Sequence, residues 1–323
     1  MLFYFYFRMF DVPKITGIIS ARNAKTIGFQ FPEGLKRQAP ALAKEVEAKT
    51  GALVIISGDP CYGACDIDDA LLDMVDVLFH FGHSRISDDD RIVFMEYYHD
   101  VDVDRAVASA LPLLGQKVGV VTTVQHIHKL DDIAKILTDA GREPVISKGD
   151  SRITYPGQVL GCNFSAVPAG VDSFLFVGSG NFHPMGMRLA HKVPVVAADP
   201  FTGEARLVDV EKIMKQRYAV MAKAMDAKKW GIIVGMKSGQ QRLALAKRLK
   251  DIAGDAVLIS IKEISPDRLL NFKVDAYVST ACPRIAIDDA GRFPAPVLTP
   301  VEFEMVKGLR SWEDLALDEI AGD

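Results

Sequence analysis

The stretch Gly58–Asp69 reads GDPCYGACDIDD and follows the apolar run Ala52-Leu53-Val54-Ile55-Ile56. A short run of β-branched and aliphatic residues with turn residues after it is typical of a buried strand. Cys61 and Cys65, two of the four cysteines of the chain, lie in the Gly/Pro-rich turn that leaves this strand. The sequence therefore predicts a strand whose carboxyl end carries thiols.

The same alternation of strand-like and helix-like patterns occurs three times along the chain. Each repeat opens with a helical pattern, at Asp11–Asn23, Val103–Leu114 and Val210–Lys229. Four strands are predicted in each repeat: Thr26–Gln30, Leu53–Ile56, Val77–Phe81 and Ile92–Tyr97; Lys117–Val121, Gln158–Leu160, Ser173–Val177 and Val193–Ala197; Trp230–Val234, Ala256–Ser260, Ala276–Ser279 and Pro296–Thr299. A further helical pattern follows each first strand, at Glu33–Ala48, Lys129–Ala140 and Gln240–Ile252.

Strands that alternate with helices predict right-handed β-α-β units, and hence parallel sheets covered on both faces. A chain of 323 residues is also too long for one ordinary hydrophobic core. We therefore expect an α/β protein of three similar small domains, each a parallel sheet flanked by helices, at residues 1–100, 101–207 and 208–323.

Three cysteines fall in similar places in the three repeats. Cys65 follows the second predicted strand of the first repeat, Cys162 follows the second of the second, and Cys282 follows the third of the third. Ligands of parallel sheets bind beyond the carboxyl ends of the strands. Three domains with these edges turned inward would present one thiolate each to a central metal cluster. The alternative is that each cysteine is an ordinary small buried hydrophobe.

Three thiolates suit an iron–sulfur cluster or zinc. A [4Fe–4S] cluster is usually held by four cysteines, so three would leave one iron open for a small molecule. Cys61 and Cys65 also form C-x3-C, the first half of the radical-enzyme signature C-x3-C-x2-C, whose third position is occupied by Asp68. Cys61 is thus a fourth ligand, a spare thiol or a buried packing residue.

Composition limits the class of partner and the compartment. The formal net charge is −4 and no block of Lys and Arg occurs, so we expect no nucleic-acid partner. Four scattered cysteines do not form a disulfide framework, which favours a reducing, cytoplasmic compartment. The apolar start MLFYFYFRMF is shorter than the roughly 20 residues of a membrane span. We interpret it as an edge segment or an upstream start ahead of Met9, with no membrane association.

Three segments together resemble a known enzyme family. They are GDPCYGACDIDD, the turn Gly161-Cys162-Asn163-Phe164, and STACPRIAIDD at Ser279–Asp289. They resemble the iron–sulfur enzymes of diphthamide biosynthesis, the 2-(3-amino-3-carboxypropyl)histidine synthases, in their archaeal homodimeric form. The similarity covers essentially the whole chain. It implies that Cys65, in the Tyr-Gly-x-Cys segment, Cys162 and Cys282 hold a [4Fe–4S] cluster, and that Cys61 does not.

The resemblance also implies a reaction. The open iron binds S-adenosylmethionine and passes it one electron, which breaks the bond from the sulfonium to the methionine γ-carbon. Methylthioadenosine leaves, and a 3-amino-3-carboxypropyl radical adds to the imidazole C2 of a histidine on translation elongation factor 2. A homodimer and an external electron donor are expected.

Polar loops at the same strand ends are candidates for binding S-adenosylmethionine. One loop, Gly178–Pro184, contains Ser179, Gly180 and His183, and Gly235–Gln241 contains Gln240 in an incomplete P-loop pattern that we expect to open a helix. A plain turn is the alternative for the first loop. Near Cys282, Arg284 suits the methionine carboxylate and Asp288 the α-amine, unless the two belong to an interdomain ion pair. The run Asp88–Asp90 we interpret as a solvated helix start.

Three other functions remain open. A quinolinate-synthase-like dehydratase also has three α/β domains around a three-cysteine cluster, but its open iron acts as a Lewis acid. A non-catalytic subunit would only relay electrons within the same pathway. A structural zinc protein would use the thiolates without any reaction.

Overall fold

The computed structural model describes residues 10–322, which form two compact units. The first unit contains the described residues up to Asp100 together with Val124–His128, and the second contains Val101–Thr123 and the described residues from Lys129 onward. The predicted edge segment at residues 1–9 lies outside the described residues. Within residues 10–322, no helix has the length and apolar character needed to cross a lipid bilayer.

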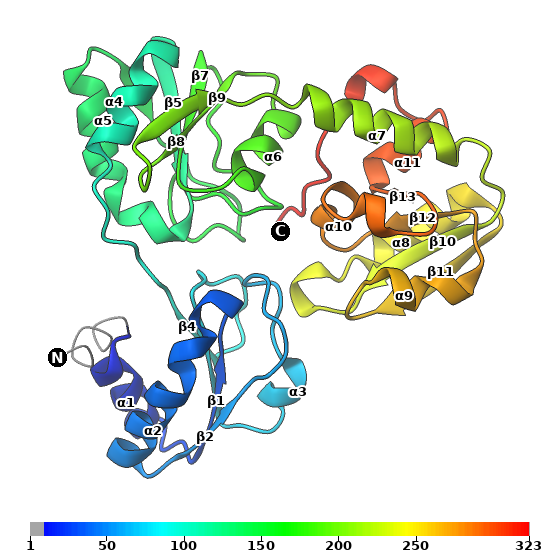
Figure 1. Cartoon of the computed structure of the whole chain (residues 1–323). Helices are drawn as coiled ribbons and strands as arrows, with labels where there is room; N and C mark the ends of the chain where they lie inside the picture. Colours follow the sequence, from blue (N-terminus) through cyan, green and yellow to red (C-terminus); the bar gives the residue numbers. More distant parts are fainter. Residues whose placement is uncertain (1–9, 323) are drawn as a thin grey trace. The chain divides into compact units, whose positions relative to one another are not determined.

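The first unit contains one four-stranded parallel sheet with the strand order β2-β1-β3-β4. Its strands are β1 (Thr26–Gln30), β2 (Leu53–Ile56), β3 (Val77–Phe81) and β4 (Ile92–Met95). Helices α1 (Val12–Ala21) and α2 (Ala39–Thr50) cover one face, and the short helix α3 (Asp69–Leu72) covers the other (Figure 1). A 3-10 segment at Glu33–Gln38 leads into α2.

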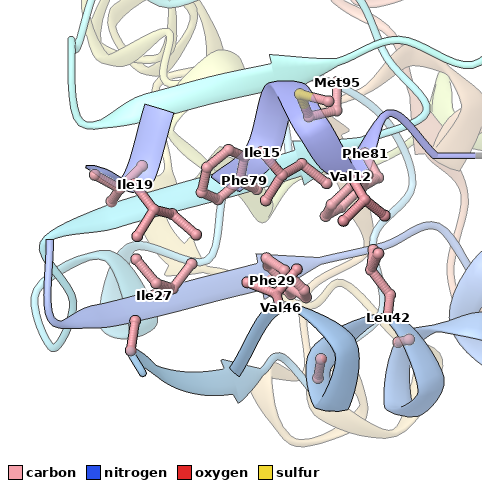
Figure 2. Packing of buried hydrophobic residues seen from close by; sticks show 14 of the residues in the cluster. Val12, Ile15, Ile19, Ile27, Phe29, Leu42, Val46, Phe79, Phe81 and Met95 are labelled. Atoms are coloured by element: carbon pink, nitrogen blue, oxygen red, sulfur yellow. The ribbon is translucent and has the colours of Figure 1, made fainter. Parts of the chain in front are cut away.

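Alternation along β1 and β3 specifies the two faces of this sheet. Ile27 and Phe29 of β1 pack with Phe79 of β3 against α1 and α2, and all three are fully buried (Figure 2). Burial of an aromatic side chain of this kind contributes about 3–5 kcal/mol, judged by its truncation to alanine. The alternating residues Gln30 and His80 are paired in register, and Gln30 accepts a hydrogen bond from the loop that precedes α3. The second face therefore ends in polar groups.

The second unit contains two sheets, of which the first has the strand order β6-β5-β7-β8-β9. Its strands are β5 (Lys117–Thr122), β6 (Glu143–Val145), β7 (Ser173–Val177), β8 (Val195–Asp199) and β9 (Glu204–Leu207). Its helices are α4 (Asp104–Ala110), α5 (Leu130–Asp139) and α6 (Phe182–Ala190), with a 3-10 segment at Leu111–Leu113. A further 3-10 segment, Val124–Lys129, follows β5, and its residues Val124–His128 belong to the first unit. All strands are parallel except β9, which pairs antiparallel with β8.

The last sheet is parallel and has the order β11-β10-β12-β13. Its strands are β10 (Trp230–Gly235), β11 (Ala256–Ile261), β12 (Ala276–Ser279) and β13 (Val297–Leu298). Its helices are α7 (Glu211–Ala224), α8 (Leu243–Ala253), α9 (Pro266–Leu269), α10 (Pro283–Ile287) and α11 (Pro300–Val306). Short 3-10 segments occur at Ser238–Gln240, Leu270–Phe272, Ala290–Arg292 and Trp312–Asp314.

One strand order is common to the three sheets, in which the first strand lies between the second and the third and the fourth follows the third. The same hydrogen-bonded aspartate stabilises this strand order in each sheet. An aspartate immediately before the third strand accepts hydrogen bonds from backbone N–H groups at the start of the first strand. Asp76 accepts from Lys25 and Thr26, Asp172 from Lys117, and Asp275 from Lys228 and Lys229. The predicted threefold α/β repeat is therefore confirmed in its sheets.

Several details of the prediction are wrong. The second strand of the middle sheet is Glu143–Val145, whereas Gln158–Leu160 forms only isolated bridges, to Thr122 and Asn163. Pro144 conceals β6 from a pattern search, but proline is tolerated there because β6 is an edge strand. Strand β9 was not predicted. The run Asp88–Asp90 starts no helix, because Asp89 caps the turn into β4 by accepting from the backbone N–H of Arg91.

The structure does not divide the chain into the three predicted domains. Each sheet falls within one of the predicted ranges 1–100, 101–207 and 208–323. The second and third sheets nevertheless belong to one compact unit. The boundary between those two ranges therefore stays a prediction.

The hydrogen-bonded aspartate makes the free energy of unfolding depend on pH in the acidic range. Backbone N–H donors lower the pKa of Asp76 from its ordinary value of 3.8, with Thr26 as the largest cause and then Lys25. A carboxylate with a lower pKa in the folded state stabilises above its unfolded pKa, and this contribution is lost as pH falls through the folded value. We expect Asp76→Asn to lose less stability than the wild type between pH 5 and pH 2, measured by urea denaturation. Asp251→Asn, at an exposed position on α8, is the control, and equal acid limbs for Asp76→Asn and the wild type would contradict the account.

Candidate metal centre

Cys65 lies in the loop between β2 and α3 of the first unit. Two buried carboxylates organise this loop: Asp66 accepts from the backbone N–H of Tyr62, and Asp68 accepts from Ser57 Oγ at 2.6 Å and caps α3 at Leu71 N. Cys65 itself is partly exposed and is present as a thiol. The loop therefore holds this sulfur at the edge of the sheet where the strands end.

Cys162 lies at the tip of a two-residue turn in the second unit. Leu160 and Asn163 close the turn through an antiparallel bridge, with backbone hydrogen bonds of 3.0 and 3.4 Å. A Cβ atom on Gly161 would lie 2.2 Å from the ring of Phe182, so only glycine lets the turn approach that ring. Cys162 is a partly exposed thiol. The predicted turn is confirmed, although it does not follow a regular strand.

Cys282 follows β12 and precedes α10. Its backbone N–H donates to Gln240 Oε1 at 3.3 Å, and Gln240 is the buried residue of the 3-10 segment after β10. Strands β10 and β12 are neighbours in the sheet. The structure thus brings together the predicted Gly235–Gln241 loop and Cys282. That loop opens no helix directly, because α8 begins only at Leu243.

A network that sequence reasoning missed connects the turns of Cys162 and Cys282. Arg242 donates to the carbonyl oxygens of Thr280 (2.7 Å) and Ala281 (3.2 Å), and it forms an ion pair with Asp318. Two residues beyond Asp318, the backbone N–H of Ile320 donates to the Cys162 carbonyl at 2.7 Å. The C-terminal segment therefore positions both cysteine turns. Burial raises the pKa of Asp318, and Arg242 lowers it only in part.

Asn163 fixes the other side of the Cys162 turn. Its Nδ2 donates to Asp150 Oδ2 at 2.7 Å and to the Ile320 carbonyl at 3.1 Å, and its Oδ1 accepts from Ser165. The net effect of its surroundings is to lower the pKa of Asp150: burial raises it, but hydrogen bonds from Gly322, Asn163, Arg152 and Ser165 outweigh burial. No local motif points to the contact with Ile320, which lies 157 residues away in the sequence.

Arg284 connects two of the predicted loops. Its guanidinium carbon lies 3.7 Å from the ring centroid of Phe182, the first residue of α6, which also contacts Gly161. Its Nε donates to Asp288 Oδ2 at 2.8 Å, one turn along α10. Arg284 and Asp288 therefore form an ion pair with each other within one helical turn, and not the interdomain ion pair that was the alternative to ligand binding. Arg284 keeps about half of its side chain exposed (52%) and so retains donors for a ligand.

The remaining candidates follow β7. Ser179 and Gly180 are exposed in the turn before α6, and Gly180 has a φ of +81°, which favours glycine. His183 lies in the first turn of α6 and stacks on Phe176. Burial lowers the pKa of His183 from 6.5 to about 4, and the positive charge of Arg284 adds to this shift. His183 is therefore neutral near pH 7.

The donor set fits an iron–sulfur cluster. Cys65, Cys162 and Cys282 are thiols at partly exposed strand-end turns, whereas Cys61 is only 4% exposed. Thiolates are the usual ligands of such clusters. In the first unit, Cys61 instead lies beside His80 and His83, whose pKa values are both lowered by burial, that of His83 to about 4.

Comparison with known proteins identifies the family. The model of a family described as diphthamide synthesis protein matches residues 31–316. The 2-(3-amino-3-carboxypropyl)histidine synthase of Pyrococcus horikoshii is 41% identical and covers 97% of this chain and 94% of that protein. Subunit 1 of the mouse synthase is 31% identical, over 94% of this chain and 73% of that protein.

The fold agrees with the same relative. The crystal structure of Dph2 from Pyrococcus horikoshii with a 4Fe-4S cluster superimposes with a TM-score of 0.90 and 39% identity, covering 97% of this chain and 94% of that chain. The resemblance inferred from the three cysteine segments is thus confirmed. The chain belongs to the family of diphthamide synthesis proteins.

Proposed function

We propose that this chain is a 2-(3-amino-3-carboxypropyl)histidine synthase, a transferase that performs the first step of diphthamide biosynthesis. The observation that carries the proposal is the 41% identity to a synthase of that name over 97% of the chain. The 0.90 TM-score to a relative that contains a 4Fe-4S cluster supports the same conclusion. The Pyrococcus synthase carries no subunit designation in its name, which favours a self-sufficient catalyst over an electron-relay subunit.

The [4Fe–4S] cluster would be held by Cys65, Cys162 and Cys282. Each is a partly exposed thiol in a loop or turn of an α/β sheet, and hydrogen bonds hold that loop or turn in place. A cluster with three protein thiolates keeps one iron available for a substrate. When bound, it would supply one electron, which separates the S-adenosylmethionine sulfonium from the methionine γ-carbon and releases methylthioadenosine.

The chain's own residues would orient S-adenosylmethionine. Arg284, held over Phe182 by stacking and by Asp288, would bind the methionine carboxylate through its remaining N–H donors. Asp288 would attract the α-ammonium group. The exposed Ser179 and Gly180, with the neutral His183, would line the same side, and Gln240 would fix the Cys282 backbone. Position decides which of the three sulfonium bonds breaks.

The acceptor would be a histidine of translation elongation factor 2, modified at its imidazole C2. The reaction also needs an external electron donor, and we expect it to take place in the cytoplasm. We expect the enzyme to act as a homodimer.

The first test is the iron content of cysteine variants after anaerobic purification. The wild type should be brown and contain about four irons per chain. Cys65→Ala, Cys162→Ala and Cys282→Ala should each lose most of the iron and the colour, because two thiolates hold a cluster poorly. Cys61→Ala is the matched control and should keep both. Iron retained in all three single variants, or lost from Cys61→Ala alone, would rule out this ligand set.

The second test is the product of S-adenosylmethionine cleavage. With a strong reductant, the wild type alone should release methylthioadenosine, detected by chromatography and mass spectrometry. A product of 5′-deoxyadenosine would refute the proposed bond cleavage. Activity that does not require a reductant would favour the Lewis-acid dehydratase, and inactivity without a sister subunit would favour the electron-relay role.

The third test concerns the C-terminal network. Asp318→Ala leaves Arg242 largely buried without its carboxylate, which should cost about 3 kcal/mol of unfolding free energy, the lower end for a broken buried pair. The Cys162 and Cys282 turns should then move, so iron content should also fall. Asp314→Ala, at an exposed position in the same segment, is the control. Wild-type stability and iron content in Asp318→Ala would show that this network positions neither turn.

A further inference from the structure

The first unit contains a second group of potential metal ligands, separate from the proposed cluster set. Cys61 Sγ, His80 and His83 offer ligand atoms that all lie within 4.8 Å of one another. Cys61 Sγ is 4.0 Å from His80 Nε2, and His80 Nε2 is 2.9 Å from His83 Nδ1. Cys65 is not a member of this group. The three side chains are buried or half-buried, so solvated surface groups do not explain their proximity.

The order and register of the strands in the first sheet bring the three side chains together. His80 lies near the end of β3, in register with Gln30 at the end of β1. His83 follows Gly82, whose φ of +85° lies in the left-handed region that favours glycine. Cys61 comes from the loop after β2. The group therefore lies at the carboxyl ends of the strands, where the first and third strands of a parallel sheet separate their connections and ligands bind.

Gln30 determines which nitrogen of His80 carries the proton. Gln30 Nε2 donates to the Asp66 carbonyl at 2.7 Å, and Gln30 Oε1 accepts from the Asp68 backbone N–H at 3.2 Å. The amide orientation is thus fixed by backbone groups. Since Oε1 can only accept, the 2.9 Å contact requires that His80 Nδ1 donates. In the neutral ring, the lone pair of Nε2 then faces Cys61 and His83.

This arrangement is the one that metal-binding histidines use. A ligating histidine generally donates its other ring N–H to an oxygen of the protein, which fixes the tautomer and the ring orientation. Gln30 supplies that oxygen here, and it is 1% exposed. The buried Gln30 therefore orients His80 as a ligand whether or not a metal is bound.

The distances can close around one ion. With Zn–N bonds of about 2.05 Å, the 2.9 Å separation of the two nitrogens corresponds to an N–Zn–N angle of about 90°. With a Zn–S bond of about 2.3 Å, the 4.0 Å separation from Cys61 Sγ to His80 Nε2 corresponds to about 134°. The third separation, from Cys61 Sγ to the His83 nitrogen, is at most 4.8 Å, whereas a tetrahedral zinc site needs about 3.6 Å, so the side chains would shift by up to about 1.2 Å. Small rotamer changes are enough.

We propose that Cys61, His80 and His83 form a second metal site, which binds a divalent transition-metal ion such as Zn²⁺ through one thiolate and two imidazoles. Thiolate and imidazole together favour zinc over magnesium or calcium, and three protein ligands leave a fourth position open. On binding, the Cys61 thiol releases one proton to solvent, and the His83 proton moves from Nδ1 to Nε2. The site does not depend on the proposed function, since it uses none of the cluster cysteines.

The test uses the full chain with Cys65→Ala, Cys162→Ala and Cys282→Ala combined, so that no cluster ligand competes. Co²⁺ is titrated anaerobically as a spectroscopic probe, and Zn²⁺ affinity is measured by displacement of the cobalt. The background variant should bind one Co²⁺ with a thiolate-to-cobalt charge-transfer band in the near ultraviolet. Adding Cys61→Ser should abolish the band, and adding His80→Gln should weaken binding at least tenfold. Adding His99→Gln, in the same unit, should change nothing.

Gln30→Met tests the positioning argument separately. It removes the oxygen that fixes His80, so binding should weaken by about 10- to 100-fold while the charge-transfer band remains at saturation. Circular dichroism establishes that each variant is folded. A folded background variant with no charge-transfer band, or a band that survives Cys61→Ser, would overturn the proposal. Loss of iron chemistry in the wild type with cobalt binding intact would refute only the proposed function.

Discussion

Parallel pairing between the first and third strands of each sheet is the constraint on which the rest of this chain depends. β1 pairs with β3, β5 with β7 and β10 with β12, while the second strand always pairs on the opposite side. The connections after the first and third strands therefore diverge and leave room for polar side chains at the sheet edge. Asp76, Asp172 and Asp275 maintain the pairing by joining the starts of the two strands.

The three sheets share the geometry at the carboxyl ends of their strands, but each carries different residues there. In the first, this edge holds the Gln30–His80 pair, in the second the turn that includes Gly180, and in the third the contact between Gln240 and Cys282. A repeated scaffold can diverge in this way because the edge residues contribute little to the core. The apolar residues on the strands can stay the same while the loops acquire separate roles.

Much of the fold and the family could be predicted from local patterns. Short β-branched runs such as Val77–Phe81, with a polar turn beyond, specify strand and edge together, and the cysteine segments are distinctive enough to indicate the family. Strand β6 could not be predicted, because Pro144 weakens its local signal and pairing with β5 stabilises it. The Arg242–Asp318 pair was equally out of reach, since it joins residues that are adjacent only after folding.

The cysteines fall into two physical classes. Cys65, Cys162 and Cys282 are partly exposed at turns, whereas Cys61 is buried beside two imidazoles. The most direct measurement is iron anomalous scattering from anaerobically grown crystals of the wild type. The account predicts one cluster bonded to the sulfur atoms of the first three cysteines, with one iron lacking a protein thiolate and no iron on Cys61. Iron bonded to Cys61, or three cysteines that share no cluster, would contradict it.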